Sequence, residues 1–305
     1  MTTNFAVGSD AWNAAISPSK IAAYLGLSPW VSPVEQWYRS HGLLEPQPSN
    51  VSMQRGTHLE AGILAWWFAQ NPQFGRVGHE VTFQRDDLPG WIATPDDDAW
   101  TIARFNGEEI PENPFGVECK SVRDDKEWGE PGTDQIPAYY LVQVMAQMHV
   151  SGRRKTAVVK HGPFVDQLDT YWVTYDPDMG AAIEQRVNEI HNSPEPPEND
   201  GTASTYNAIR KVHADIDRDE DWQINPALGV ELEEARRGFA AAESRLNLAK
   251  SDTLRAMGRA RRAMVGDICL GQRQPTKSGA SLYPPRKAVD LDALRAQLTP
   301  AATAA

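Results

Sequence analysis

The chain has 305 residues, of which 41% are hydrophobic and 23% charged, and its net charge at pH 7 is -11. This length suffices for one large hydrophobic core or two smaller ones. The N-terminal segment lacks the basic and apolar regions of a secretory signal, and the longest apolar run, residues 61–69, is too short to span a bilayer. Two cysteines supply neither a disulfide framework nor a four-cysteine metal cluster. We therefore expect a cytoplasmic protein without membrane contact.

The acidic charge is spread unevenly. Residues 195–221 hold eight acids and three bases, whereas residues 236–287 hold twelve lysines and arginines and three acids. An acidic net charge argues against DNA contact, because phosphate contacts need Lys and Arg. A basic face on an acidic protein is nevertheless compatible with DNA binding, although a solvated helix face is the more frequent explanation of such a segment. The net charge alone therefore excludes neither function.

Residues 1–192 mix helical and strand patterns. Ser17 or Ser19 begins one helical pattern and Ser32 with Pro33 begins another, as expected of helix caps and first turns. The expected helices are residues 17–27, 32–42, 55–71 and 136–152, and the expected strands are residues 77–85, 90–100, 116–122, 155–162 and 168–175. We therefore predict an α/β core, a mixed central sheet flanked by helices.

The rest of the chain divides by composition. Residues 193–226 are rich in proline and acids and predict a linker with a short helix. Residues 227–298 predict a helical extension, in which a long helix runs to about Met264 and a small hairpin turns at Ser278-Gly279. Residues 299–305 are expected to be disordered.

The long helix carries an apolar stripe. Its members recur every three or four residues: Leu228, Leu232, Ala235, Phe239, Ala242, Leu246 and Ala249. Such a stripe most often packs on the protein's own body or on a short antiparallel partner. A dimeric coiled coil is the less favoured interpretation, because alanine dominates the stripe.

The stretch "GVECKSV", residues 116–122, places an acid and a lysine in an apolar run. Because strand side chains alternate between faces, Glu118, Lys120 and Val122 project to one side. Two buried charges are tolerable only if they are paired or serve a metal. A salt bridge on an exposed edge strand is the commoner reason for such a pattern, so the stretch gains meaning only if other carboxylates converge on it.

Two further acids are candidates. Asp96 lies in "ATPDDDAW", between strand-like segments, and is expected beside Glu118, although an acidic triplet is usually a solvated turn. Glu60 shares a helix face with Ile63, Leu64 and Trp67. An acid on an apolar face needs a cation, or a first-turn position near the positive end of the helix.

Together, Glu60, Asp96, Glu118 and Lys120 predict an oxygen-ligand site for Mg²⁺, which prefers carboxylates, water and phosphate. Such an ion would polarise a phosphodiester, and Lys120 would orient water or stabilise developing charge. On the helix at 136–152, Tyr140, Gln143 and Gln147 share a face. They could hold water or phosphate in the site, or form a polar surface stripe.

"TPD" followed by "ECK" resembles the PD-(D/E)xK nuclease signature. "ISPSKIAAYLGLSPWVSPVEQW", "RGTHLE", "ATPD", "VECKS" and "YYLVQVMAQMHVSG" follow one another in the order of the lambda-exonuclease or YqaJ-type viral recombinase family, which is phage-encoded. The resemblance covers roughly residues 15–152, and more loosely the C-terminal extension.

This resemblance implies a restriction-endonuclease-like core and an exonuclease that depends on Mg²⁺, for which Mn²⁺ is expected to substitute. It would degrade the 5′ strand of linear duplex DNA and leave 3′ overhangs for recombination. By resemblance, Asp96, Glu118 and the helix residue Glu60 hold the metal, and Lys120 and Gln143 are catalytic. Ser19, Lys20 and Tyr140 are the candidates for contact with DNA or its 5′ phosphate. Relatives often form ring trimers and work with a single-strand annealing protein.

Two departures from the family pattern stand out. Relatives commonly carry an arginine near this N-terminal stretch that binds the 5′ phosphate, but here no arginine precedes Arg39, and Lys20 is the closest base. Strict dependence on a 5′ phosphate is therefore not expected. Relatives more often have Asp-Gly where this chain has Asp96-Asp97-Asp98, so the extra acids either crowd the metal or point into water.

Two other functions fit the same residues. A structure-specific or restriction-type endonuclease would use the same site and would also cut closed circular DNA. A non-cleaving adaptor that binds DNA ends is disfavoured, because Asp96, Glu118 and Lys120 are all present.

Overall fold

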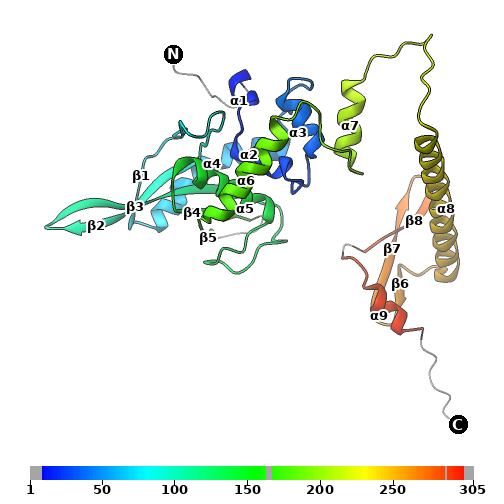
Figure 1. Cartoon of the computed structure of the whole chain (residues 1–305). Helices are drawn as coiled ribbons and strands as arrows, with labels where there is room; N and C mark the ends of the chain where they lie inside the picture. The colour runs from blue at the N-terminus through cyan, green and yellow to red at the C-terminus, as the bar shows by residue number, and fades with distance from the viewer. Residues whose placement is uncertain (1–8, 163–166, 286, 299–305) are drawn as a thin grey trace. The chain divides into compact units, whose positions relative to one another are not determined.

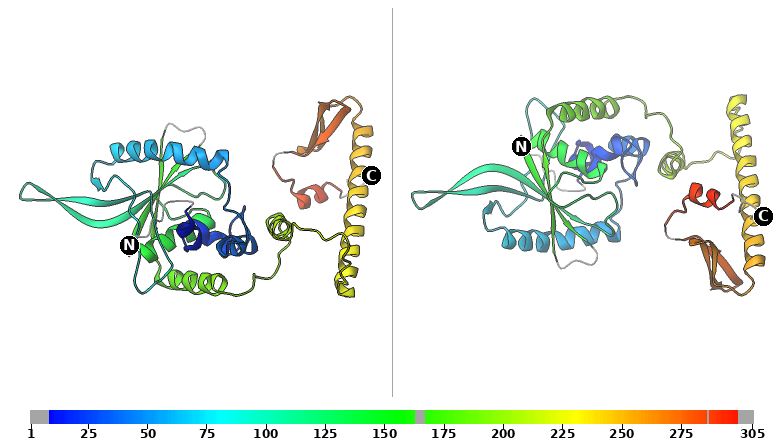
Figure 2. Two further views of the ribbon diagram at one scale, coloured as in Figure 1. Left: turned by 90° about the horizontal axis from the view of Figure 1, so that it is seen from above. Right: turned by 90° about the horizontal axis from the view of Figure 1, so that it is seen from below.

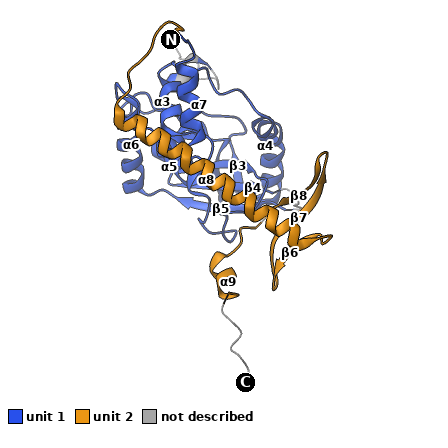
Figure 3. Ribbon diagram, turned by 90° about the vertical axis from the view of Figure 1, so that its right-hand side faces the viewer, with its two compact units in different colours: residues 1–216 blue, residues 217–305 orange. Residues whose placement is uncertain are grey.

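The computed structural model describes residues 9–162, 167–285 and 287–298. The predicted disordered tail, residues 299–305, lies outside the described residues. The chain forms two compact units, residues 1–216 and 217–305, shown in separate colours in Figure 3. Among the described residues, no helix is both long enough and apolar enough to cross a membrane.

The first unit is built on a five-stranded sheet whose strands lie in chain order. The strands are β1 (Phe74–Arg76), β2 (Asp97–Phe105), β3 (Glu108–Ser121), β4 (Lys155–His161) and β5 (Asp169–Thr174). All neighbours pair antiparallel except β3 and β4, which run parallel. A parallel pair needs a crossover connection, and here α5 (Ala138–Ser151) supplies it. The predicted mixed sheet flanked by helices is confirmed.

Helices cover both faces of this sheet (Figure 2). On one face α4 (Val51–Gln70) packs through Ile63, Leu64 and Trp67. The other face carries α2 (Pro18–Tyr24), α3 (Pro33–Ser40), α5 and α6 (Pro177–His191) over a larger apolar cluster. Val158 in β4 belongs to this larger cluster, while its neighbours Ala157 and Val159 face α4, as strand alternation requires.

Two short helices complete the unit. The first, α1 (Asp10–Ala14), begins after the Ser9 cap. The second, α7 (Ala203–Val212), lies in the segment predicted as a linker, yet it packs on α3. Thr205 Oγ1 donates to Ser32 Oγ at 2.8 Å, and Ala208 is buried. The compact unit therefore extends beyond the proline-rich segment that follows α6.

Several predicted boundaries were wrong. Residues 77–85 form no strand; only Phe83 bridges Ala93, because Gly78 and Gly90 take positive φ angles that break regular pairing on both sides. In the predicted strand 90–100, regular pairing begins only at Asp97. The helix α6 had not been predicted.

The strand around Glu118 is longer than predicted. It begins at Glu108 and forms with β2 a two-stranded arm that projects beyond the rest of the first unit (Figure 1). Asn106 and Gly107 form its turn with φ angles of 52° and 85°, the conformation that two-residue hairpin turns require.

The second unit contains α8 (Pro226–Met257), β6 (Arg262–Val265), β7 (Ile268–Thr276), β8 (Gly279–Tyr283) and α9 (Leu291–Ala296). The strands form an antiparallel sheet in the order β6-β7-β8. The β7–β8 turn is Lys277-Ser278, one residue earlier than the predicted Ser278-Gly279, because Gly279 already pairs with Thr276. The long helix ends at Met257 instead of Met264, because Gly258 leaves the helical conformation with φ 55°. Not one residue of α8 is buried.

Candidate active site

The pairing of β2 with β3 brings the two central acids together. Asp97 at the start of β2 lies opposite Val117, so Asp96, one residue earlier, lies beside Glu118 and Cys119. The backbone N–H of Cys119 donates to Asp96 Oδ2 at 2.7 Å. Asp96 is therefore held against the strand that carries Glu118, as predicted.

Helix α5 and Lys120 of β3 supply the partners of Glu118. Lys120 Nζ and Gln143 Nε2 both donate to Glu118 Oε1 at 2.6 Å, and Gln147 Nε2 donates to Oε2 at 2.7 Å. Gln143 Oε1 also accepts from Lys120 Nζ at 3.2 Å, and the Tyr140 ring lies 4.8 Å from that nitrogen. The spacing of these α5 residues places all three on the helix face that meets β3.

Four of the charged residues predicted for the site border one small cavity. It has a volume of about 160 Å³, and its lining includes Glu60, Asp96, Glu118 and Lys120. Glu60 reaches it from the middle of α4, not from a first turn. Asn50 caps that helix by accepting from the backbone of Ser52 and Met53, so a favourable helix-end position does not explain Glu60.

The electrostatics of the cavity favour a cation. Burial raises the pKa of Asp96 well above its usual range, and the charges of Glu118 and Glu60 raise it further. Burial and the Glu118 charge also raise the pKa of Glu60. Burial alone would lower the pKa of Lys120, but Glu118 and Asp96 outweigh it and raise that pKa. One ammonium group thus faces three carboxyl groups, and a bound cation would relieve their mutual repulsion.

The site suits a metal ion that takes only a few ligands from the protein and completes its coordination with water or substrate. In the described part of the chain, no group of three His, Cys, Asp or Glu side chains is arranged to hold a metal ion. Mg²⁺ usually keeps several waters and binds through one or two carboxylates and substrate phosphate. Asp96 and Glu118 line one cavity and suit this mode. Glu60, which lines the same cavity, remains a candidate ligand.

The other two acids of the triplet are neutralised elsewhere. The buried Asp97 pairs with Arg76 at 2.8 Å and accepts from the backbone of Gly78 at 3.1 Å. Asp98 pairs with Arg153 through both oxygens, with 2.7 Å between Nε and Oδ1. Both expectations for these acids were therefore wrong: they neither crowd the metal site nor point into water.

The predicted phosphate contacts are less well placed. Lys20 is buried, and its Nζ donates to the carbonyl oxygens of Trp12 at 2.6 Å and Ala15 at 2.8 Å. This lysine ties α2 to the segment before it, and nothing in its position presents it to DNA. Ser19 is exposed at the second position of α2, where its hydroxyl lies 3.2 Å from that of Ser17, and it does not line the 160 Å³ cavity.

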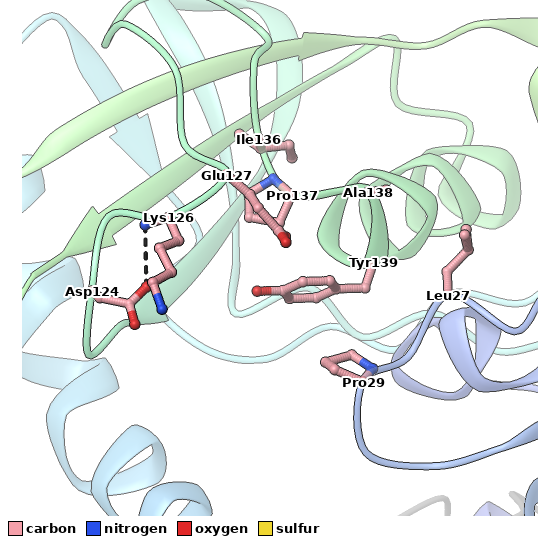
Figure 4. A pocket seen from close by; sticks show the side chains of 9 residues that line it. All are labelled: Leu27, Pro29, Asp124, Lys126, Glu127, Ile136, Pro137, Ala138 and Tyr139. Atoms are coloured by element: carbon pink, nitrogen blue, oxygen red, sulfur yellow. Dashed lines mark hydrogen bonds between the residues drawn. The ribbon is translucent and has the colours of Figure 1, made fainter. Parts of the chain in front are cut away.

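A wider cavity of about 590 Å³ lies in the same unit, as Figure 4 shows. The Tyr139 side chain lies between Pro29 on one side and Glu127 and Pro137 on the other. Its ring is 4.4 Å from that of Tyr140, which in turn contacts Lys120. The lining also contains Asp124, so carboxylates outnumber the single cation, Lys126. This acidic lining does not suit a phosphate.

Sequence reasoning underrated three residues. Gln147 was expected either to hold water or phosphate in the site or to belong to a surface stripe, whereas it donates to Glu118 directly. Its spacing of four from Gln143 was the available signal. Arg76 and Arg153 were missed, because no local pattern connects them with the acids they neutralise.

Fold and site together define a class: a mixed α/β protein in which an acid directly before one strand meets an acid and a lysine of the neighbouring strand at one cavity. The model of the family described as YqaJ-like viral recombinase domain matches residues 10–154. The resemblance seen in the sequence is thereby confirmed for residues 10–154.

Solved structures give weaker likenesses. LHK-Exo in complex with dAMP is 18% identical, with a TM-score of 0.44, and the match covers 67% of this chain and 93% of that one. LHK-Exo is described as an alkaline exonuclease from Laribacter hongkongensis. A phage-related exonuclease from Haemophilus somnus 129PT is 13% identical, with a TM-score of 0.43 and coverage of 57% and 90%. No match was found among curated protein sequences. The likeness to the family rests on the match of its model to residues 10–154.

Proposed function

We propose that this protein is a Mg²⁺-dependent 5′-to-3′ exonuclease that acts on linear double-stranded DNA and generates 3′ single-stranded overhangs for phage homologous recombination. The observation that carries the proposal is the meeting of Glu60, Asp96, Glu118 and Lys120 at one cavity. The recombinase family of residues 10–154 agrees with it. Mn²⁺ is expected to replace Mg²⁺, because both accept carboxylate and water ligands.

Asp96 and Glu118 would hold the ion, with Glu60 as a further ligand or as a base for a bound water. When bound, Mg²⁺ would polarise the scissile phosphodiester and lower the pKa of a coordinated water. Gln143 and Gln147 donate to both oxygens of Glu118. These two hydrogen bonds therefore fix the orientation of the Glu118 carboxylate and of the lone pairs that would bind the ion.

Lys120 is the electrostatic partner of the reacting phosphate. Its ammonium is positioned by Glu118 and Gln143 and backed by the Tyr140 ring. A charge fixed before the reaction stabilises negative charge that develops on a phosphate oxygen without reorganisation. Lys120 would also orient the attacking water.

We expect the protein to digest DNA ends without strictly requiring a 5′ phosphate. Lys20 is engaged by two carbonyl oxygens, and no arginine precedes Arg39. Ser19 remains the candidate contact for the terminal phosphate. A ring trimer and a single-strand annealing partner belong to the same proposal.

The test is digestion of linear duplex DNA labelled at either its 5′ or its 3′ end, with Mg²⁺ or with EDTA, beside a closed circle. The native chain is compared with Lys120→Ala and with a matched control, Lys126→Ala, which changes an exposed lysine six residues along the chain. We expect early release of 5′-labelled nucleotide from the native chain and from Lys126→Ala. Loss of Lys120 should slow release at least 100-fold, which corresponds to about 2.7 kcal/mol of transition-state stabilisation.

Each other outcome points to a different function. Nicking of the circle would assign the protein to the endonucleases. Early release of the 3′ label would reverse the polarity. No cleavage of any substrate, with binding of DNA ends retained in EDTA, would replace the proposal with the adaptor function.

A further inference from the structure

The long helix of the second unit exposes its apolar stripe. Within that stripe Leu232 is 46% exposed, Phe239 72% and Leu246 54%, and no residue of α8 is buried. Helices of this kind gain most of their stability from packing an apolar face rather than from helix propensity. The stripe is therefore a surface that lacks its packing partner within the second unit.

The spacing of the stripe is that of a coiled-coil seam. Leu232, Phe239, Leu246 and Thr253 recur every seven residues, and a second set lies four residues before each of them: Leu228, Ala235, Ala242 and Ala249. Alternating steps of four and three define a and d positions of a heptad, with bulky residues at a and mainly alanine at d. The alanine content, which argued against a coiled coil in general, instead restricts its geometry.

Bulk at a and alanine at d favour one orientation. In a parallel pair each a residue faces its own copy, so Phe239 would face Phe239 and Ala242 would face Ala242. The layers of paired bulky residues would then be too crowded and the layers of paired alanines would leave cavities, and both destabilise a packed seam. In an antiparallel pair each a residue faces a d residue, so every bulky side chain lies opposite a small one.

Charge and packing together select a register. A two-fold axis between residues 240 and 241 places Leu232 opposite Ala249 of the second copy, and Phe239 opposite Ala242. The same register brings Arg236 beside Glu243 of the second copy, twice by symmetry. Such opposite charges flanking the seam set partner choice and orientation in coiled coils.

The neighbouring register is disfavoured. A shift that moves the axis to residue 244 brings Glu243 against its own copy and Arg236 against Lys250. In the favoured register, like charges meet only near the outer ends, where Glu231 lies beside Asp252 and water screens them.

We propose that the a/d stripe of α8 is a self-association surface, on which α8 of a second copy of this chain packs antiparallel about an axis between residues 240 and 241. The contact is two-fold, so it joins chains in pairs. It does not depend on nuclease activity. If the first unit forms rings of three, this contact would join chains of separate rings.

Disulfide trapping tests the orientation in the full chain. Leu232 and Ala249 are 17 positions apart, which is about 26 Å along a helix, so cysteines there cannot link within one chain. We expect Leu232→Cys/Ala249→Cys to form a covalent dimer on mild oxidation, while each single variant and the native chain, with Cys119 and Cys269, do not. A dimer from Leu232→Cys alone would indicate parallel pairing and overturn the proposal.

Light-scattering mass tests the surface itself. Phe239→Glu places a charge in the seam, and Leu248→Glu is the matched control, because Leu248 is also exposed, at 63%, but lies outside the seam. We expect an even number of chains per particle for the native protein and Leu248→Glu, and half that number for Phe239→Glu, with helix content by circular dichroism unchanged. An unaltered mass for Phe239→Glu would show that α8 packs on the first unit of its own chain or on another protein, and would refute self-association.

Discussion

The ion pair between Arg153 and Asp98 allows a quantitative test of how the acidic triplet is tolerated. The change is Arg153→Met in the full chain, which keeps most of the side-chain length and removes the guanidinium. Asp98, with only 8% of its side chain exposed, would then lose its only cationic partner among the described residues. It would remain as an unpaired negative charge two residues from Asp96. Arg153 also lies over the Phe83 ring, at 5.3 Å, a contact that methionine partly preserves.

The expected loss follows from the burial of the two partners. Removing one partner of a fully buried ion pair costs about 3–5 kcal/mol, because the other charge is left uncompensated. Arg153 keeps 23% of its side chain exposed, so solvent reduces the effect, and we expect a loss of about 2–3 kcal/mol in the free energy of unfolding. Adding Asp98→Asn removes the stranded charge and should restore about half of that loss.

Urea unfolding followed by tryptophan fluorescence is the appropriate assay. Nine of the ten tryptophans lie in residues 1–216 and the tenth is Trp222, so the signal reports the unit that contains the pair. Arg154→Met is the matched control, because Arg154 is exposed and takes no part in an ion pair among the described residues. If Arg153→Met loses no more stability than this control, or if Asp98→Asn restores nothing in the double variant, the pair does not neutralise the triplet as argued.

Two further predictions concern the packing around the site. Burial lowers the pKa of Lys20 from 10.5 to about 8, so between these values the unfolded chain binds more protons than the folded one. Stability relative to Lys20→Met should rise by about 3 kcal/mol from pH 8 to pH 10.5; a flat difference across that window would contradict the assignment. In α6, a Cβ on Gly180 would lie 2.5 Å from Tyr175 Oη and 2.8 Å from His149 Nδ1. Gly180→Ala should therefore cost about 1–3 kcal/mol in the same unfolding assay, whereas Gly238→Ala, which meets open space, should leave that transition unchanged.

The residues around the site differ in how far sequence reasoning could place them. Strand alternation correctly put Glu118 and Lys120 on one face, and the caps at Ser32 and Gly152 correctly marked a helix start and a helix end. These features depend on neighbours within a few residues. The proximity of Asp96 to Glu118 needed only the additional assumption that consecutive strands pair.

Predictions failed where distant residues decide the outcome. The partners of Asp97 and Asp98 lie 21 and 55 positions away, so these two acids looked solvated although both are buried and paired. The start of α4 at Val51, after the Asn50 cap, was missed because residues 51–54 lack apolar periodicity, which left a first-turn position open as an explanation of Glu60. The carbonyl groups that accept from Lys20 belong to Trp12 in α1 and to Ala15 directly after it, and no residue pattern encodes this contact.

The connection order of the sheet has a consequence for how the site assembles during folding. The β2–β3 arm is a local hairpin, and hairpins form in about 1–10 μs. Pairing β3 with β4 must wait until the crossover through α5 closes, and such non-local parallel contacts form slowly. Asp96 and Glu118 can therefore meet early at the base of the arm, with Lys120 as their only local counter-charge. Gln143 and Gln147 arrive with the crossover helix, so the carboxylates acquire their fixed orientation in a late step of folding.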